Sequence, residues 1–251
     1  MSKIYCLSDL HIGYRSSNYP KIMEILDLVK QDADMLILCG DIFDLWLCPE
    51  EIILTEEPYY SAYKKLVEDL NESMNVLWMD KKIIYVSGNH DYLIHRWDDG
   101  GIPFVPFPVV RKWDMELNGR RYLFIHGWQF DTIIEPLMNL ASMVPELYYE
   151  FVSRFPWIYQ KFWKHPGDIP RTEAAYSQKS EKIHRVADEF RKRMGYDYLI
   201  MGHTHDPGIY VYQRQDPDIS NAVVDCGDMI DSLSYVVIED GIPEVRSTAT
   251  R

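Results

Sequence analysis

The chain has 251 residues and a net charge of −13, and 47% of its residues are hydrophobic, which suits one domain with an insertion or two small domains. No run of 18 apolar residues occurs, which argues against a membrane-spanning helix, and the negative charge argues against general binding to nucleic acid. The four cysteines are scattered without a Cys-x-x-Cys pair, so we expect reduced thiols and a cytoplasmic location.

The first half of the chain alternates apolar runs with helical patterns. We expect strands at residues 3–7, 35–39 and 83–86, separated by helices near 20–30 and 59–74. Strand, helix, strand, helix, strand in this order predicts a parallel α/β core. Because a strand pattern begins at residue 3, we expect no secretory leader in front of it.

The second half predicts a hairpin, an insertion and a strand-rich tail. Asn118-Gly119, between expected strands at residues 109–117 and 121–125, is a strong signal for a two-residue turn. Residues 131–195 read as helices broken by prolines, and we interpret them as a helical cap inserted into a core made of residues 1–130 and 196–251. The expected cap helices are 133–144, 146–155, 157–164 and 172–194, and the expected later strands are 198–201, 208–213, 222–225, 234–238 and one around Val245.

Five polar clusters follow apolar, strand-like runs. In chain order they are Asp9-x-His11, Gly40-Asp41-x-x-Asp44, Gly88-Asn89-His90-Asp91, His126-Gly127 and Gly202-His203-x-His205. Each one alone is compatible with a turn or a polar loop, because Asp, Asn and Gly are common turn formers. Together and in this order they predict one site, since parallel strands deliver the residues at their carboxyl ends to the same edge of a sheet.

The residue types indicate the chemistry of that site. Neutral imidazoles, carboxylates and an amide oxygen are ligands for borderline divalent cations. A carboxylate between two ions can bridge them, and two ions about 3.5–4 Å apart can hold a phosphoryl group and lower the pKa of a water from about 15.7 towards neutrality. The clusters therefore predict a dinuclear metal site that supplies hydroxide as a nucleophile.

The five ordered motifs, from Asp9 to His205, resemble those of the calcineurin-like metallophosphoesterases. The resemblance implies a β-sandwich flanked by helices. It also implies a ligand set, with Asp9, His11 and His205 on one metal, Asn89, His126 and His203 on the other, and Asp41 bridging. His90 would be the catalytic acid, with Asp44 orienting its ring, a pairing that makes independent sense because a carboxylate holds an adjacent imidazole protonated. Our first choice for the ions is Mn²⁺, and Fe, Zn, Ni and Co also suit the ligands.

Within that family the chain is most similar to the UDP-2,3-diacylglucosamine diphosphatases, in its length, its His126-Gly127 motif and its insertion before Gly202-His203. In those enzymes the insertion caps the metal site and holds acyl chains. Two features differ. Those enzymes usually carry Arg at the position of His90. Their cap helix has a Ser/Asn/Lys pattern whose approximate counterparts here are Thr172, Tyr176 and Lys179. Asp225 also stands where the family usually has Asn, and we assign no role to the segment 225–228. These differences favour a related substrate over that one.

The insertion has two further properties. Between Glu150 and Gly195 basic residues outnumber acidic ones, although the whole chain is acidic, so this segment can be a solvated helical face or can attract an anionic substrate. Its aromatic side chains either pack the cap together, hold an apolar part of the substrate or touch a membrane surface. They are Tyr148, Tyr149, Phe151, Phe155, Trp157, Tyr159, Phe162 and Trp163.

We therefore predict a metal-dependent phosphatase or pyrophosphohydrolase that acts on a small or lipid-linked phosphate compound. One alternative keeps the metals and changes the substrate, to a phosphodiester, a nucleic acid or a phosphoprotein. The other is a scaffold with this fold that has no catalytic activity. The scaffold is the weakest interpretation, because the chain keeps every expected ligand together with His90.

Overall fold

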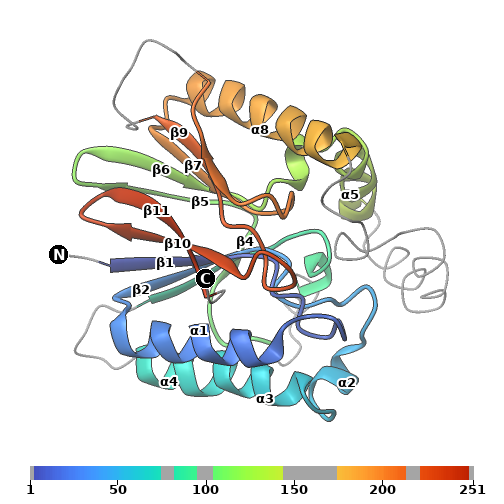
Figure 1. Cartoon of the computed structure of the whole chain (residues 1–251). Helices are drawn as coiled ribbons and strands as arrows, with labels where there is room; N and C mark the ends of the chain where they lie inside the picture. The colour runs from blue at the N-terminus through green and yellow to red at the C-terminus, as the bar shows by residue number, and fades with distance from the viewer. Residues whose placement is uncertain (1–2, 75–81, 95–103, 144–173, 213–220, 249–251) are drawn as a thin grey trace.

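The computed structural model describes residues 3–74, 82–94, 104–143, 174–212 and 221–248. Its strands form two sheets that face each other, and helices cover the outer side of each sheet (Figure 1). The expected α/β sandwich flanked by helices is confirmed.

The larger sheet has the strand order β11-β10-β1-β2-β3-β4, in which β1 to β4 run parallel and β10 and β11 are antiparallel additions. Its strands are β1 (Lys3–Leu7), β2 (Met35–Cys39), β3 (Lys82–Val86), β4 (Val109–Val110), β10 (Ser234–Glu239) and β11 (Ile242–Ser247). Long apolar runs form these central strands because both faces of the sheet are covered. The side chains of residues 4–7 in β1 and 36–39 in β2 are all buried.

The smaller sheet has the order β5-β6-β7-β9-β8, with β6, β7 and β9 parallel. Its strands are β5 (Trp113–Leu117), β6 (Arg120–Phe124), β7 (Tyr198–Met201), β8 (Gly208–Tyr210) and β9 (Ala222–Asp225). The predicted hairpin is confirmed, and both turn residues, Asn118 and Gly119, have positive φ (53° and 74°), as a tight hairpin turn requires. The expectation of one strand over 109–117 is wrong. β4 pairs with β3 and β5 pairs with β6, so the chain passes from one sheet to the other at residues 111–112.

Helices α1 (Tyr19–Asp32), α3 (Tyr59–Tyr63) and α4 (Asn71–Met74) lie under the larger sheet (Figure 1), and α2 (Glu50–Ile53) comes directly before α3 in the chain. The side chain of Asn18 caps α1 by accepting a hydrogen bond from the backbone N–H of Lys21 at 3.2 Å. The predicted helix over 59–74 is present, but its middle seven residues, Lys64–Leu70, form a π-helix, η1.

The described helices within residues 131–195, which we predict to be an insertion, are α5 (Ile134–Met143) and α8 (Ala174–Met194), and a short 3₁₀ helix, η3 (Trp128–Phe130), comes before them. The helices expected at 146–155 and 157–164 lie outside the described residues. Helix α8 covers the outer face of the smaller sheet (Figure 1), where its Ile183 and Ala187 belong to one apolar cluster with Leu199 and Val223. Among the described helices none has both the length and the apolar character needed to span a membrane.

Apolar side chains from both sheets fill the space between them. Ile37 of β2 and Val236 of β10 share this cluster with Phe124 of β6 and Ile200 of β7, and all four are fully buried. Burial of this kind stabilises the fold by roughly 25 cal/mol per Å² of apolar surface. It also fixes the ends of β1, β2, β6 and β7 relative to one another.

We predict that Ile37→Ala lowers the free energy of unfolding by about 2–5 kcal/mol, because it leaves a cavity between the two sheets. The matched control is Ile242→Ala in β11, where the side chain is 51% exposed, and its cost should stay below about 1 kcal/mol. Urea unfolding of the metal-free proteins measures both. Equal losses for the two variants would contradict an inter-sheet core at Ile37.

Candidate metal centre

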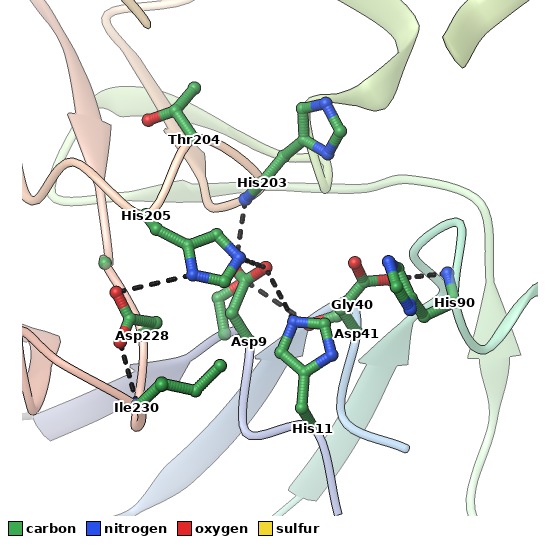
Figure 2. A network of polar contacts seen from close by, with 12 residues as sticks. Asp9, His11, Gly40, Asp41, His90, His203, Thr204, His205, Asp228 and Ile230 are labelled. Carbon is green, nitrogen blue, oxygen red and sulfur yellow. Dashed lines mark hydrogen bonds and ion pairs between the residues drawn. The ribbon is translucent and has the colours of Figure 1, made fainter. Parts of the chain in front are cut away.

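Five strands end beside one another, and each is followed by one of the predicted polar clusters. The ends of β1, β2 and β3 carry the first three clusters in the larger sheet, and the ends of β6 and β7 carry the last two in the smaller sheet. Figure 2 shows Asp9, His11 and Asp41 from the larger sheet close to His203 and His205 from the smaller one. The site therefore lies where the two sheets meet at one end of the sandwich.

Three groups of side chains place their possible ligand atoms within 4.8 Å of one another. They are Asp9, His11 and His205; His11, Asp41 and His90; and Asp41, His126 and His203. Oδ1 of Asp9 lies 3.1 Å from Nε2 of His205 and 3.6 Å from Nε2 of His11. Oδ2 of Asp41 lies 3.1 Å from Nε2 of His126. The second group shares His11 with the first group and Asp41 with the third, so it links the two.

Several buried atoms of this cluster make no hydrogen bond of ordinary geometry among the described residues, although Oδ1 of Asp9 faces His205 and Nε2 of His126 faces Asp41. They are Oδ1 of Asp9, Oδ1 of Asn89 and Nε2 of His126. Buried polar atoms nearly always have a partner, because removing them from water is costly. A cation between carboxylate, amide and imidazole ligands would satisfy these atoms, so the residues present fit divalent metal ions.

The backbone at the site is held in an unusual conformation. Asp9, His11, Asp41, His203 and His205 all have positive φ, between 47° and 71°. For residues other than glycine this left-handed region costs energy, and it persists where the surrounding structure imposes it, often at functional sites. Five of the seven predicted metal ligands share the feature.

Glycines next to the ligands allow the loops to approach one another closely. A Cβ on Gly88 would lie 2.1 Å from Oδ1 of Asp41, and one on Gly202 would lie 1.9 Å from Oγ of Ser8. A Cβ on Gly40 would lie 2.4 Å from Nδ1 of His126. Each of these positions needs glycine because a neighbouring polar group occupies the space of a side chain.

The imidazoles are oriented from behind by a second set of acceptors. Nδ1 of His126 lies 2.8 Å from the carbonyl oxygen of Cys39, and Nε2 of His203 lies 3.2 Å from Oδ2 of Asp131. Nδ1 of His205 lies 3.5 Å from Oδ2 of Asp228. Partners of this kind fix the tautomer and the orientation of an imidazole that binds a metal.

His90 is held by two side chains from the loop after β2. Oδ1 of Asp44 lies 3.1 Å from Nδ1 of His90, as expected, and Oδ2 of the same carboxylate lies 3.4 Å from Nδ1 of His11. The indole of Trp46 stacks on the His90 ring with 4.2 Å between the centroids. The orientation of His90 is therefore fixed by both a hydrogen bond and a ring contact.

Asp91 joins the loops after β2 and β3. Its carboxylate accepts hydrogen bonds from the backbone N–H groups of Ile42 (2.7 Å) and Gly88 (2.6 Å). A third hydrogen bond joins the same two loops, because the backbone N–H of His90 donates to Oδ1 of Asp41 at 2.8 Å. Burial and the nearby charge of Asp41 raise the pKa of Asp91 to about 6. Asp91 therefore has a structural role, which is to hold the two loops together. Asp41 is the carboxylate at the centre of the site.

The buried carboxylates set the charge of the histidines. Burial lowers the pKa of His126 and His205, but the charges of Asp41 and Asp9 outweigh it and raise both pKa values to about 10. Hydrogen bonds that His11 donates to Asp44 and Asp9 likewise overcome burial and raise the pKa of His11 to about 9. The charges of these histidines in turn hold the pKa values of Asp9 and Asp41 below their usual range, against the effect of burial. Without metal, protons on His11, His126 and His205 would take the place of cations, whereas burial lowers the pKa of His203.

Some of these residues were missed by the sequence patterns. Asp131 lies outside the five motifs, and Asp228 lies in the segment 225–228, to which we assign no role from the sequence alone. Neither position indicates a contact with a histidine elsewhere in the chain. Trp46 was missed because an aromatic residue near a strand end usually belongs to the core. Of the three counterparts of the Ser/Asn/Lys pattern, Lys179 forms an ion pair with Asp131 at 2.8 Å, whereas Thr172 and the side chain of Tyr176 lie outside the described part of the chain. The cap aromatics between residues 148 and 163 lie outside it as well.

Known proteins resemble the chain in sequence and in structure. Proteins named UDP-2,3-diacylglucosamine hydrolase include one from Actinobacillus succinogenes, 25% identical over 229 residues, which are 84% of this chain and 86% of that protein. Another, from Photorhabdus laumondii, is 26% identical over 238 residues, 87% of this chain and 88% of that protein. Among solved structures, an archaeal phosphodiesterase aligns over 97% of both chains with a TM-score of 0.45 and 15% identity.

The family assignment comes from a match to the model of the calcineurin-like phosphoesterases, which spans residues 2–207. This range is well over half of the chain and includes all five polar clusters. The resemblance expected from those clusters is confirmed, and the chain belongs to the calcineurin-like phosphoesterase family.

Proposed function

We propose that this chain uses two divalent ions to hydrolyse a small or lipid-linked phosphate compound, as a phosphatase or a pyrophosphohydrolase. Membership of the family makes it a metal-dependent hydrolase of phosphate esters or pyrophosphates. The observation that supports a dinuclear centre is the place of Asp41, which groups with His11 and His90 on one side and with His126 and His203 on the other. A carboxylate in that position suits a bridge between two ions.

The proposed ligands follow from the groups. Asp9, His11 and His205 would hold one ion, and His126 and His203 would hold the other together with Asn89, whose Oδ1 has no hydrogen-bond partner among the described residues. Asp41 would be shared. We take Mn²⁺ as the activating ion, with Fe, Zn, Ni and Co as alternatives that this mixture of oxygen and nitrogen ligands also accepts.

The bound ions would supply a water acidified for attack and positive charge for the phosphoryl oxygens. His90 would act beside them as the general acid. Because its Nδ1 faces Asp44 at 3.1 Å, the proton on Nε2 is the one that it would pass to the departing oxygen. The stack with Trp46 (4.2 Å between centroids) limits rotation of the ring and keeps that proton aimed in one direction.

Similarity to UDP-2,3-diacylglucosamine hydrolases supports a substrate in which a phosphate is joined to an apolar group. Lys179 adds a half-exposed positive charge next to Asp131 and His203, which suits an anionic substrate. His90 in place of the usual Arg is the reason to propose a related compound in place of that one. The net charge of −13 speaks against the nuclease alternative.

We also propose a cytoplasmic location and peripheral contact with a membrane through the insertion. All four cysteines are free and buried, as suits a reducing compartment. Ile133, Leu140 and Met143, in or next to α5, are 63%, 59% and 78% exposed, and exposed apolar side chains of this kind suit an interfacial surface.

We predict that His90→Ala lowers kcat by about 10²–10⁴-fold, the range for loss of a positioned acid–base group, while the metal content stays that of the wild type. Hydrolysis of an aryl phosphate and elemental analysis measure the two quantities. The contrasting variant is Asp41→Asn, which is nearly isosteric and tolerates positive φ, and which should lose at least one ion together with activity. Wild-type turnover in the His90 variant would exclude its role as the acid.

We predict that Mn²⁺ binding releases at least one proton and becomes tighter between pH 6.5 and 8.5. The pKa values of His11, His126 and His205 are raised to about 9, 10 and 10, so protons occupy nitrogens that a metal needs, and a higher pH removes this competitor. Titration calorimetry in two buffers with different protonation enthalpies counts the protons. A binding enthalpy that does not depend on the buffer would contradict this electrostatic picture.

The experiment that tests the function is hydrolysis, with and without Mn²⁺, of an aryl phosphomonoester, an aryl phosphodiester and a UDP-linked lipid. We expect turnover to require the metal and to be strongest for a substrate with an apolar group. Turnover of only the simple aryl esters would remove the lipid assignment, and turnover of only the diester would favour the phosphodiesterase alternative. No metal binding and no turnover would favour the scaffold.

A further inference from the structure

A second buried polar cluster lies behind the loop that carries His203 and His205. It consists of Thr204 in that loop, Asp225 at the end of β9 and His184 in the middle of α8, with exposed fractions of 5%, 0% and 0%. Oδ2 of Asp225 accepts a hydrogen bond from Oγ1 of Thr204 at 2.8 Å and lies 3.0 Å from Nε2 of His184. Figure 2 shows Thr204 pointing away from Asp9 and His11, so this cluster faces the side of the loop opposite the metal centre.

Both oxygens of the buried Asp225 carboxylate have hydrogen-bond partners. Burial raises the pKa of Asp225, and His184 acts against that rise. Oδ1 of Asp225 accepts from the backbone N–H of Gly227 at 2.8 Å. The ring of His184 stacks on Tyr210, with 3.9 Å between the centroids. A buried carboxylate with this many hydrogen bonds holds its partners in a fixed arrangement, because the loss of one partner would leave a carboxylate oxygen buried without compensation.

Thr204 connects this cluster to the metal centre. It stands between His203 and His205, whose φ angles are 71° and 54°. Its Oγ1 also accepts from the backbone N–H of Asp206 at 3.3 Å. Left-handed residues so close together need external support, and the hydroxyl of Thr204, held by Asp225, supplies it from the rear.

Helix α8 contacts the same loop at a second point. Nζ of Lys179 lies 2.8 Å from Oδ2 of Asp131, and that oxygen lies 3.2 Å from Nε2 of His203. Lys179 and His184 thus reach the loop along two routes, one through Asp131 and one through Asp225. Helix α8 is therefore connected to His203 through Asp131 and to Thr204 through Asp225.

We infer that His184 and Asp225 are positioning residues for the metal centre: through Thr204 they hold His203 and His205 in place and so set the affinity for metal. The inference rests on the proposed function, since it takes these two histidines as ligands. It assigns no contact with substrate to His184, Asp225 or Thr204. Outer partners of metal ligands typically change metal affinity by about 10–100-fold when they are removed.

The test compares Thr204→Val, which removes the hydroxyl and keeps the shape, with Thr204→Ser, which keeps the hydroxyl. Mn²⁺ alone is titrated into each metal-free protein in competition with a fluorescent chelator. We expect the Kd for Mn²⁺ to rise by about 10–100-fold in Thr204→Val and to return close to the wild-type value in Thr204→Ser. Thr55→Val, on the exposed surface after α2, is the matched control and should leave the Kd unchanged.

Unfolding of the metal-free proteins by urea separates positioning from simple stabilisation. If Thr204→Val lowers stability but binds Mn²⁺ with the wild-type Kd, the cluster is only structural and the inference is wrong. If Thr204→Val does not fold, Asp225→Asn is measured in the same way, because it keeps an oxygen for Thr204 and removes the charge that faces His184. Failure of the wild-type protein to bind Mn²⁺ would instead overturn the proposed function.

Discussion

The structure depends on the pairing of buried carboxylates with buried imidazoles between the two sheets. Asp9 and Asp41 are almost completely inaccessible to solvent, and burying a charge without a partner is among the costliest events in folding. In the metal-free chain the charges of Asp41 and Asp9 favour protonated partners, because they raise the pKa values of His126 and His205. Divalent ions can replace those protons with little change of geometry, because the nitrogen and oxygen atoms already face one another.

This arrangement is possible because the rest of the sandwich is rigid. The ligands lie in loops whose backbone has unfavourable φ angles, and glycines such as Gly88 and Gly202 let those loops touch. The apolar cluster between the sheets fixes the strand ends from which the loops start. The energy that holds the strained loops therefore comes from ordinary hydrophobic burial elsewhere, as is typical of sites that are organised before they bind their ligands.

The local pattern of the chain predicts the strands and the clusters that follow them, because a run such as residues 36–39 is apolar on both faces and ends in Gly-Asp. The convergence of the clusters follows from the same rule, since parallel strands place their carboxyl ends together. The break between β4 and β5 could not be predicted, because the alternation of apolar and polar side chains over residues 113–117 is also typical of a strand and does not indicate which strand it pairs with. Asp131, Asp228 and His184 could not be predicted either. Each acts on a residue far away in the sequence, and nothing in its own neighbourhood distinguishes it from a surface or core residue.

The contacts of α8 bear on how substrate choice and metal binding are related. Lys179 of this helix is half-exposed and pairs with Asp131, so an anionic substrate that attracts Lys179 would compete with that carboxylate for it. Asp131 would then interact more strongly with His203, its other partner at 3.2 Å. His184 holds the opposite side of the same loop through Asp225 and limits any movement that follows. If α8 orients His203 and His205 as we propose, a change of this helix that suits a new substrate would also affect metal binding. This constraint would give Lys179, the position that matches the lysine of the Ser/Asn/Lys pattern, a second role beside attraction of the substrate, which is to pair with the carboxylate that contacts His203.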